Sequence, residues 1–246
     1  MKKLLVALAT VVCAFTINAQ ESNTVVSNAD TNASCQNKTS NCCFKQSPHH
    51  FTMSLGYGFC LSDKHDAILA NYNASETHRS SMRHGVDYRF DYDYNFHNNF
   101  AAGLVFNMYN SFDSYYAGDE KIGTNSDDRW LFYVGPSFTA HTNMVKDHYI
   151  FFAKATVGYL NFRNAQRSLS ADGSQILSTT YSRGTFGYGL SAGVSYYINK
   201  YISLDCSLGY MGGEVSKLKT AQETFDLEEN ENLSRLNINV GVKIKL

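Results

Sequence analysis

The chain of 246 residues contains 17 Tyr, 16 Phe and 17 Gly but only 2 Pro, a composition that favours β-strands because aromatic side chains suit pleated surfaces. Its 21 Lys and Arg residues face 22 Asp and Glu residues, so the chain lacks the basic excess of a nucleic-acid-binding protein. No stretch approaches the 18 or more apolar residues that a membrane-spanning helix needs, which excludes a helical membrane protein.

Residues 1–19 match a secretory signal peptide. Two lysines precede the apolar run Leu4–Ile17, and the small residue Ala19 marks the predicted cleavage site. The chain is therefore expected to be exported, and loss of the two lysines leaves 19 basic against 22 acidic residues, a net charge of −3. A lipoprotein would use Cys13 as the lipidated residue, but Val12 stands where a small residue is preferred.

Residues 20–48 are rich in Asn and Ser and predict a flexible periplasmic tail. The tail contains Cys35, Cys42 and Cys43, and His49 and His50 follow it. Adjacent cysteines lack the C-x-x-C spacing of a zinc site, so disulfide formation in an oxidising compartment is favoured over metal binding. Five cysteines remain after cleavage, so at least one stays unpaired or bonds outside the chain. We expect no metal and no cofactor.

Eight segments alternate apolar and polar residues, the pattern of a strand with one face in each of two environments. In chain order they lie near residues 51–61, 82–94, 100–111, 129–140, 148–160, 184–198, 201–211 and 235–246. The first places Phe51, Met53 and Leu55 opposite Thr52 and Ser54. The last is the clearest, because both of its faces are unbroken for twelve residues.

Pro136 interrupts the fourth segment. Proline cannot donate to a β-ladder, so we expect a bulge or a sheet edge there. In the fifth segment, Ile150 and Phe152 blur the polar face. Cys60 and Cys206 fall on opposite faces of strands that are not adjacent, so no disulfide is expected between them.

The connections alternate between short and long. Short turns are expected near residues 95–99, 141–147 and 199–200, and longer loops of about 17 to 23 residues near 62–81, 112–128, 161–183 and 212–233. Even strand number, short periplasmic turns and long outer loops are typical of a transmembrane barrel. The sequence therefore predicts an all-β, eight-stranded antiparallel up-and-down transmembrane β-barrel over residues 49–246, with both termini periplasmic.

A soluble barrel of lipocalin type has the same alternation with the apolar face inside. Two features favour the membrane. The apolar face is nearly free of charge, whereas charged residues gather with Gly and Ser on the polar face, as a narrow polar lumen would require. Tyr and Phe also recur toward the ends of the apolar face, where aromatic girdles lie.

On this strand pattern the chain resembles the small outer-membrane β-barrel family that includes the OmpA transmembrane domain and OmpX. Its last strand is similar to the C-terminal signal that the barrel-assembly machinery reads, carried here by Val242, Ile244 and Leu246, although many members end in Phe rather than Leu. The resemblance implies a bacterial outer-membrane location and contact with outer-membrane lipids and lipopolysaccharide.

The charged residues of the polar face are the first candidate site. They are Asp87, Arg89, Asp91, Asp93, Lys154, Asp205, Arg235, Lys243 and Lys245, which we call the lumen charge network. We expect mutual pairing that fills the lumen rather than ion conduction, because a barrel of this size is normally packed. Only one strand separates Asp91 and Asp93 from Lys243 and Lys245, so those residues are expected to bridge.

Two other classes of function remain as alternatives, a small-solute channel and an outer-leaflet enzyme. Lipid A palmitoyltransferases resemble the layout, and His65, His78, Asp113 and Ser114 on the first two long loops offer an acyl-transfer set with His as general base. The amphipathic helix typical of those enzymes is missing from the segment before the first strand.

The long loops are the last candidate, because barrels concentrate function on loops held by a rigid scaffold. Tyr115 and Tyr116 in the second loop and the acidic stretch 226–231 in the fourth could bind a surface ligand whose identity the sequence does not specify. We therefore expect a non-enzymatic outer-membrane protein that contributes to envelope integrity or to surface binding.

Overall fold

The computed structural model describes residues 48–62, 80–116, 124–146, 148–170, 174–220 and 224–246. The predicted signal peptide, and all of the predicted tail except Pro48, lie outside the described residues. Within the described ranges the chain forms nine strands: β1 His49–Cys60, β2 His84–His97, β3 Phe100–Tyr116, β4 Thr124–His141, β5 Tyr149–Leu169, β6 Gln175–Tyr197, β7 Ile202–Lys219, β8 Thr224–Asn232 and β9 Arg235–Lys245. None of the described segments contains a helix long and apolar enough to cross a membrane.

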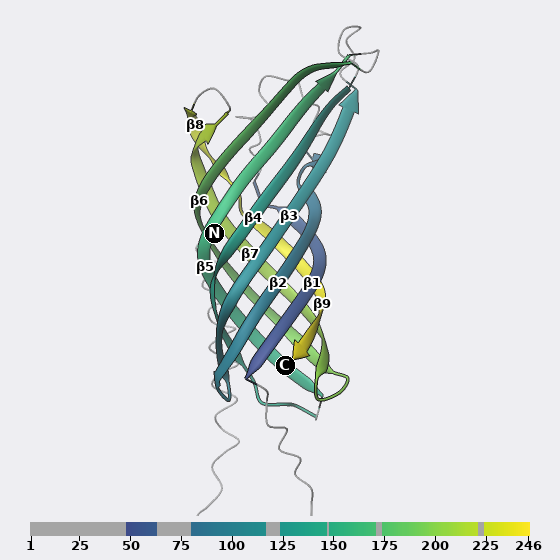
Figure 1. Ribbon diagram of the computed structural model, residues 1–246, viewed down its shortest axis with the longest axis vertical. Coiled ribbons are helices and arrows are strands. Elements are labelled where there is room, and N and C mark those ends of the chain that lie inside the picture. Colours follow the sequence, from purple (N-terminus) through teal and green to yellow (C-terminus); the bar gives the residue numbers. More distant parts are fainter. Residues whose placement is uncertain (1–47, 63–79, 117–123, 147, 171–173, 221–223) are drawn as a thin grey trace, which may run out of the picture. The chain divides into compact units, whose positions relative to one another are not determined.

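Eight of these strands form a closed antiparallel ring (Figure 1). The order is β6-β5-β4-β3-β2-β1-β9-β7, and pairing of β6 with β7 closes it. The short strand β8 pairs with β7 and lies outside this ring. The predicted ring of eight antiparallel strands is confirmed, with β8 as an addition inside the last long connection.

The register of the ring is staggered. Starting at Asp93 of β2, the ladder partners on β3, β4, β5 and β6 lead to Met211 on β7. In the other direction, the partners on β1 and β9 lead to Lys245, whose amide donates to the Tyr201 carbonyl at 2.8 Å. Tyr201 and Met211, the residues reached by the two routes, are ten positions apart in the chain, and this offset is the shear of the barrel. An eight-stranded barrel of tilted strands leaves an interior just wide enough for side chains to fill.

Five strands are longer than the sequence pattern predicted. Strands β3 to β7 have 17, 18, 21, 23 and 18 residues, so the expected loops 112–128, 161–183 and 212–233 are largely strand. The ladder of β3 and β4 continues to Tyr116 and Thr124, and that of β5 and β6 to Leu169 and Gln175. Figure 1 shows β3 to β6 continuing past the end of β2. The alternation of apolar and polar residues ended before the strands did, because polar residues occur on both faces of the extensions while backbone pairing continues there.

Pro136 produces neither a bulge nor a sheet edge. Strand β4 pairs with β3 on one side and β5 on the other, and its register to β5 is the same at Val134 and at Ser137, on either side of the proline. The ladder to β5 is interrupted only at Gly135 and Pro136. The Thr156 hydroxyl donates to the Pro136 carbonyl at 2.8 Å, so a side chain replaces part of the lost pairing.

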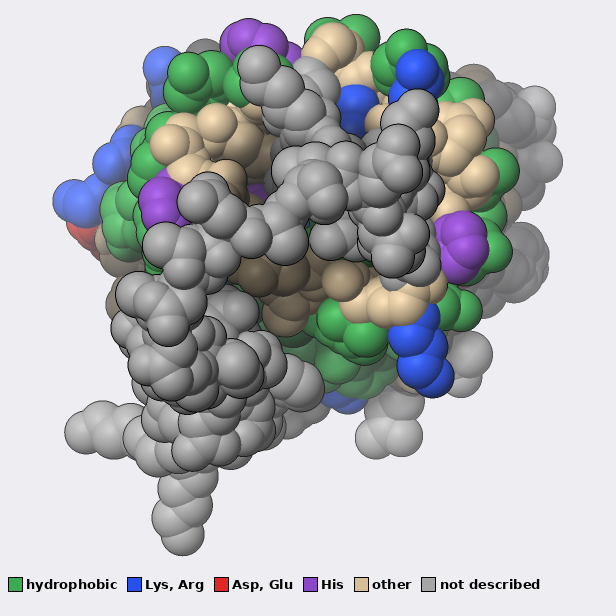
Figure 2. Space-filling view, turned by 90° about the horizontal axis from the view of Figure 1, so that it is seen from below, with side chains coloured by type: hydrophobic (Ala, Val, Ile, Leu, Met, Phe, Trp, Pro, Cys, Tyr) green, Lys and Arg blue, Asp and Glu red, His purple; other side chains and the backbone are tan. Residues whose placement is uncertain are grey.

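The outward face of the ring is apolar. Leu55, Val157, Phe186, Leu208 and Val240 are between 50% and 63% exposed in the isolated chain. This apolar band begins at the end of the barrel that has the short turns. Within the band, no outward position of the described ring residues carries Lys, Arg, Asp or Glu. On the ring strands, the outward positions stay apolar up to Phe59, Val86, Met108, Trp130, Tyr159, Phe186, Tyr210 and Leu236. Seen from the end with the short turns, hydrophobic side chains recur round the outer wall (Figure 2).

The inward face combines large rings with glycines. The Tyr109 side chain is fully buried and crosses the lumen side of β1 and β2. A Cβ built on Gly85 would clash with the Asn110 carbonyl oxygen and would lie 2.6 Å from Cζ of Tyr109. Glycine at this position therefore makes room for the tyrosine ring inside the ring of strands.

Candidate functional site

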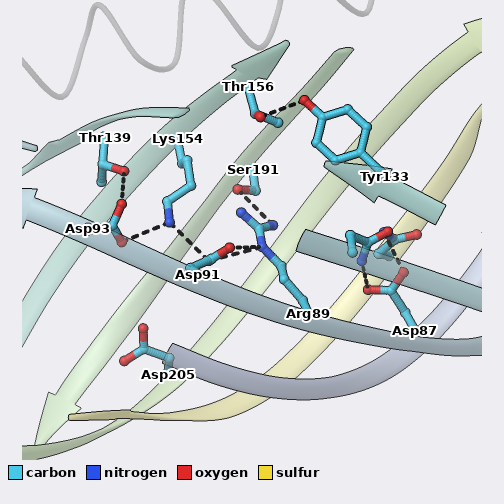
Figure 3. A network of polar contacts seen from close by, with 12 residues as sticks. Asp87, Arg89, Asp91, Asp93, Tyr133, Thr139, Lys154, Thr156, Ser191 and Asp205 are labelled. Atoms are coloured by element: carbon cyan, nitrogen blue, oxygen red, sulfur yellow. Dashed lines mark hydrogen bonds and ion pairs between the residues drawn. The ribbon is translucent and has the colours of Figure 1, made fainter. Parts of the chain in front are cut away.

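Four charged side chains form the centre of the lumen charge network (Figure 3). Lys154 reaches from β5 so that its Nζ lies 2.9 Å from a carboxylate oxygen of Asp91 and 2.9 Å from one of Asp93. Arg89 donates from Nε to Asp91 at 3.0 Å. The period of two along β2 places its three members on one face, and all four side chains are buried. Two cations therefore balance two carboxylates.

Neutral hydroxyl groups complete the coordination of this centre. The Thr139 hydroxyl donates to Asp93 at 3.2 Å, and Arg89 donates to the Ser191 hydroxyl at 3.3 Å. These partners come from β4 and β6, so the contacts join strands across the interior rather than along one wall (Figure 3). The charges are thereby held in fixed positions.

Asp87 occupies the next position up the lumen on β2. Its carboxylate accepts hydrogen bonds from Asn107 at 2.8 Å and Asn237 at 3.1 Å, and Nε of Arg235 lies 3.9 Å away. Arg235 also donates to Asn107, and its guanidinium carbon lies 5.3 Å from the centre of the Tyr109 ring. Asp87 and Arg235 are each 0% exposed, so this pair is fully enclosed.

At the short-turn end, the lysines have partners other than those expected. Lys243 lies 2.8 Å from Asp205 and donates to the Ser195 hydroxyl at 2.8 Å. Lys245 lies over the Tyr197 ring at 4.0 Å. The predicted bridge from Asp91 and Asp93 to these lysines is not among the ion pairs of the described residues, because Lys154 reaches the carboxylates from across the narrow lumen. Residues two strands apart on the wall are separated by about 9.5 Å.

Above the network, bulky apolar side chains cross the lumen. This apolar layer consists of Tyr109, Leu131, Tyr133, Leu160, Phe162, Met211, Val215 and Leu233, each no more than 6% exposed. Ladder pairing brings Tyr133 beside Leu160 and Leu131 beside Phe162. The Tyr133 hydroxyl is satisfied by the Thr156 hydroxyl at 2.6 Å (Figure 3). The interior is therefore closed by packed side chains at this level.

A second polar set lies beyond the apolar layer. This upper polar layer contains Asn125, Asp127, Arg129, Asn164, Gln166, Ser168 and Glu231, all buried. Glu231 of β8 lies 3.8 Å from Arg129 of β4. The acidic stretch 226–231 is thus not uniformly a solvated loop, since Glu231 is buried whereas Asp226 forms an exposed pair with Lys217 at 2.9 Å.

Sequence reasoning missed the apolar layer. The available sign was the run of five large apolar residues from Trp130 to Val134, which interrupts the alternation of polar and apolar residues in β4. Outward Trp130 and Phe132 masked the inward Leu131 and Tyr133, because both faces of the strand are apolar there. The period of two does not by itself distinguish an apolar side chain that faces lipid from one that belongs to the apolar layer inside the barrel.

The residues of the enzyme alternative do not converge within the described structure. Asp113 and Ser114 are consecutive residues of β3, not of a loop, and consecutive strand residues point to opposite faces. His65 and His78 lie outside the described residues. In the described part of the chain, no group of three His, Cys, Asp or Glu side chains is arranged to hold a metal ion.

Two other sequence predictions concern exposure. Cys60 is buried and Cys206 is exposed, and both thiols are free, as expected for opposite faces of the barrel wall. Val242, Ile244 and Leu246 all point outward at the end of the chain, with 40%, 39% and 73% of their surfaces exposed. Tyr115 and Tyr116 belong to β3 rather than to a loop.

Comparisons with known proteins are limited to the fold. No family model and no curated protein matches the chain. Among solved structures, Neisserial surface protein A is similar at 15% identity, covering 81% of this chain and 98% of that chain, with a TM-score of 0.48. A major outer membrane protein from Thermus thermophilus (12% identity, 80% and 98% coverage, TM-score 0.47) and OprG from Pseudomonas aeruginosa (12%, 82% and 98%, 0.44) are also similar.

Proposed function

We propose that this chain is a non-enzymatic protein of the bacterial outer membrane, a barrel with a closed lumen that contributes to envelope integrity and displays an extended sheet outside the membrane. The observation that carries the proposal is the opposite character of the two faces of the ring. The outward face is an uninterrupted apolar band, and the inward face holds paired charges and a packed apolar layer. A water-soluble barrel would require the reverse arrangement.

The height of the band supports a membrane location. On β9 it extends from Leu236 to Leu246, about 33 Å along the strand at about 3.3 Å per residue. With a strand tilt of about 40°, the band is about 25 Å tall, the height of the apolar band of outer-membrane barrels. An exposed apolar surface this large is destabilising in water but is solvated by lipid chains.

The filled interior supports a scaffold rather than a small-solute channel. A conducting pore needs a continuous polar path, and here the apolar layer separates the lumen charge network from the upper polar layer. Below it, direct ion pairs at 2.8 to 3.0 Å join six of the charged side chains, Arg89, Asp91, Asp93, Lys154, Asp205 and Lys243. Such pairs stabilise a packed interior and leave little freedom for a moving ion.

The extensions of β3 to β6 supply the surface that would face the exterior. Above the band, polar residues such as Ser114, Ser126, Arg163 and Arg167 appear at outward positions, next to the exposed ring of Phe112. The short turns lie at the other end, so we propose that they and both termini are periplasmic. The extended sheet would then present its side chains to surface ligands.

We also propose two partners for this function. Outer-membrane lipids, lipopolysaccharide among them, would cover the apolar band. The outward side chains of Val242, Ile244 and Leu246 are placed on the terminal strand, where the barrel-assembly machinery would read them during insertion.

A charge placed on the band tests the membrane location. Val240 points outward in the middle of β9 and is 60% exposed, so Val240→Arg would cost about 2 to 4 kcal/mol in a bilayer. Ser114→Arg adds the same charge at an exposed position beyond the band and serves as the control. We expect Val240→Arg to lose outer-membrane assembly and heat-modifiable migration on gels while Ser114→Arg retains both. Equal behaviour of the two variants, or recovery of the wild-type protein in the soluble fraction, would contradict the proposal.

A further inference from the structure

A hollow on the outer wall of the barrel combines aromatic and basic side chains. This outer-wall hollow, of about 290 Å³, lies over β4 and β5 and is lined by Asp128, Trp130, Phe132, Arg163, Ala165 and Arg167. All six alternate with inward-facing residues, so they belong to the face that carries the apolar band. The hollow is separate from the lumen and from its charge network.

The hollow lies at the upper limit of the apolar band. Trp130 is the last apolar outward residue of β4, and its ring stacks on that of Phe132 with ring centres 5.8 Å apart and planes inclined by 8°. Arg163 is four residues beyond Tyr159, the last band residue on β5, or about 13 Å along the strand. With a tilt of about 40°, its Cα is about 10 Å above Tyr159. Trp130 is the ladder partner of Arg163, so the aromatic floor borders the top of the apolar band, and the side chains of Arg163 and Arg167 lie at and above that border, on the side of the lipid headgroups.

The two arginines of the hollow differ in their charge environment from the arginines of the lumen. Among the described residues, no carboxylate lies within ion-pair distance of Arg163 or Arg167, and both side chains are exposed. The one acidic residue of the lining, Asp128, accepts a hydrogen bond from Asn110 at 2.7 Å. The hollow therefore carries an excess of positive charge on two guanidinium groups, which bind phosphate through paired N–H donors.

We propose that the outer-wall hollow binds the phosphorylated headgroup of an anionic lipid of the outer leaflet. The phosphate would lie between Arg163 and Arg167, and the first part of an acyl chain would pack on Trp130 and Phe132. The inference rests on the proposed function, since it requires the band to be in a bilayer. Lipid is favoured over free phosphate because the aromatic floor continues the lipid-facing band and would be unused by an inorganic ion.

The only tryptophan of the chain, Trp130, lines the hollow and is therefore a built-in probe. The full-length protein would be reconstituted in vesicles of phosphatidylcholine that contain a fixed fraction of acyl-brominated lipid, either phosphatidylglycerol or phosphatidylcholine. Bromine quenches tryptophan at short range. We expect brominated phosphatidylglycerol to quench wild-type Trp130 more strongly, with an apparent preference of about five-fold for each arginine. Raised salt should reduce this preference.

The arginine variants decide whether the preference belongs to the hollow. Arg163→Gln with Arg167→Gln should abolish it. The matched control, Arg183→Gln with Lys219→Gln, removes two exposed positive charges that do not line the hollow and should retain it. Equal loss in both double variants would overturn the proposal, because general surface charge would then account for the effect.

Two further outcomes separate the possible failures. If inorganic phosphate at low millimolar concentration removes the preference, the site takes a free ion and the lipid proposal is wrong. If wild-type Trp130 is quenched equally by both lipids in protein that migrates in its folded form, the barrel is inserted and the site alone is refuted. If neither lipid quenches Trp130 and no folded band forms, the proposed membrane function itself has failed.

Discussion

Replacing Lys154 with methionine should strongly destabilise the barrel. The Lys154 ammonium lies 2.9 Å from each of Asp91 and Asp93, and the three side chains are 4%, 8% and 7% exposed. Methionine keeps much of the length and volume but leaves two buried carboxylates facing the single guanidinium of Arg89. Breaking a buried pair in this way costs about 3 to 5 kcal/mol, because the surplus charge has neither water nor a counterion.

The measurement is urea unfolding in phospholipid vesicles, followed by Trp130 fluorescence and by the fraction that migrates as folded protein. Lys217→Met is the control: the Lys217–Asp226 pair has the same 2.9 Å distance but side chains 49% and 75% exposed, so its loss should cost no more than about 1 kcal/mol. Asp93→Asn should partly rescue Lys154→Met by removing the surplus charge, with a coupling of about 2 kcal/mol. Equal effects of the two lysine variants, or additive effects of Lys154→Met and Asp93→Asn, would refute the reasoning.

Two further predictions concern packing and closure of the lumen. Gly85→Ala should lower the free energy of unfolding by about 1 to 3 kcal/mol, because the new Cβ would lie 2.6 Å from the Tyr109 ring. The control is Gly209→Ala, whose Cβ would have its nearest neighbour 3.4 Å away. In the same unfolding assay, this control should be within about 0.5 kcal/mol of wild type. In planar bilayers, folded wild-type protein should give no discrete conductance, and Leu131→Ser with Phe162→Ser should introduce conductance by opening the apolar layer. Stepwise currents from the wild type would contradict a closed lumen.

The strand pattern of the ring could be predicted because each residue on an alternating strand meets one of two different environments. In the last strand, Leu236 to Leu246 and Arg235 to Lys245 alternate without a break, and the structure places them on opposite faces. The same rule placed Cys60 inside and Cys206 outside. It also placed every member of the lumen charge network on the inward face, eight of them buried and Lys243 nearly so.

The rule stopped where the two environments became alike. Beyond the apolar band both faces of β3 to β6 carry polar residues, so alternation ended although backbone pairing continued to Leu169 and Gln175. In the middle of β4 both faces are apolar, so the sequence pattern did not show which residues of the run from Trp130 to Val134 belong to the apolar layer. Pro136 predicted a defect, yet ladder pairing on both sides of it kept the strand in register.

The sequence by itself determined which side chains point into the barrel and which point out, since that choice depends on the period of two and on local polarity. Which inward side chains meet was decided by the tertiary structure alone. Lys154 is 63 residues from Asp91 and 61 from Asp93 along the chain, and β3 and β4 lie between their strands in the wall of the ring. Closure of the ring with a shear of ten brings these groups to one level of a narrow lumen, and contact across that lumen depends on the whole barrel rather than on any one strand.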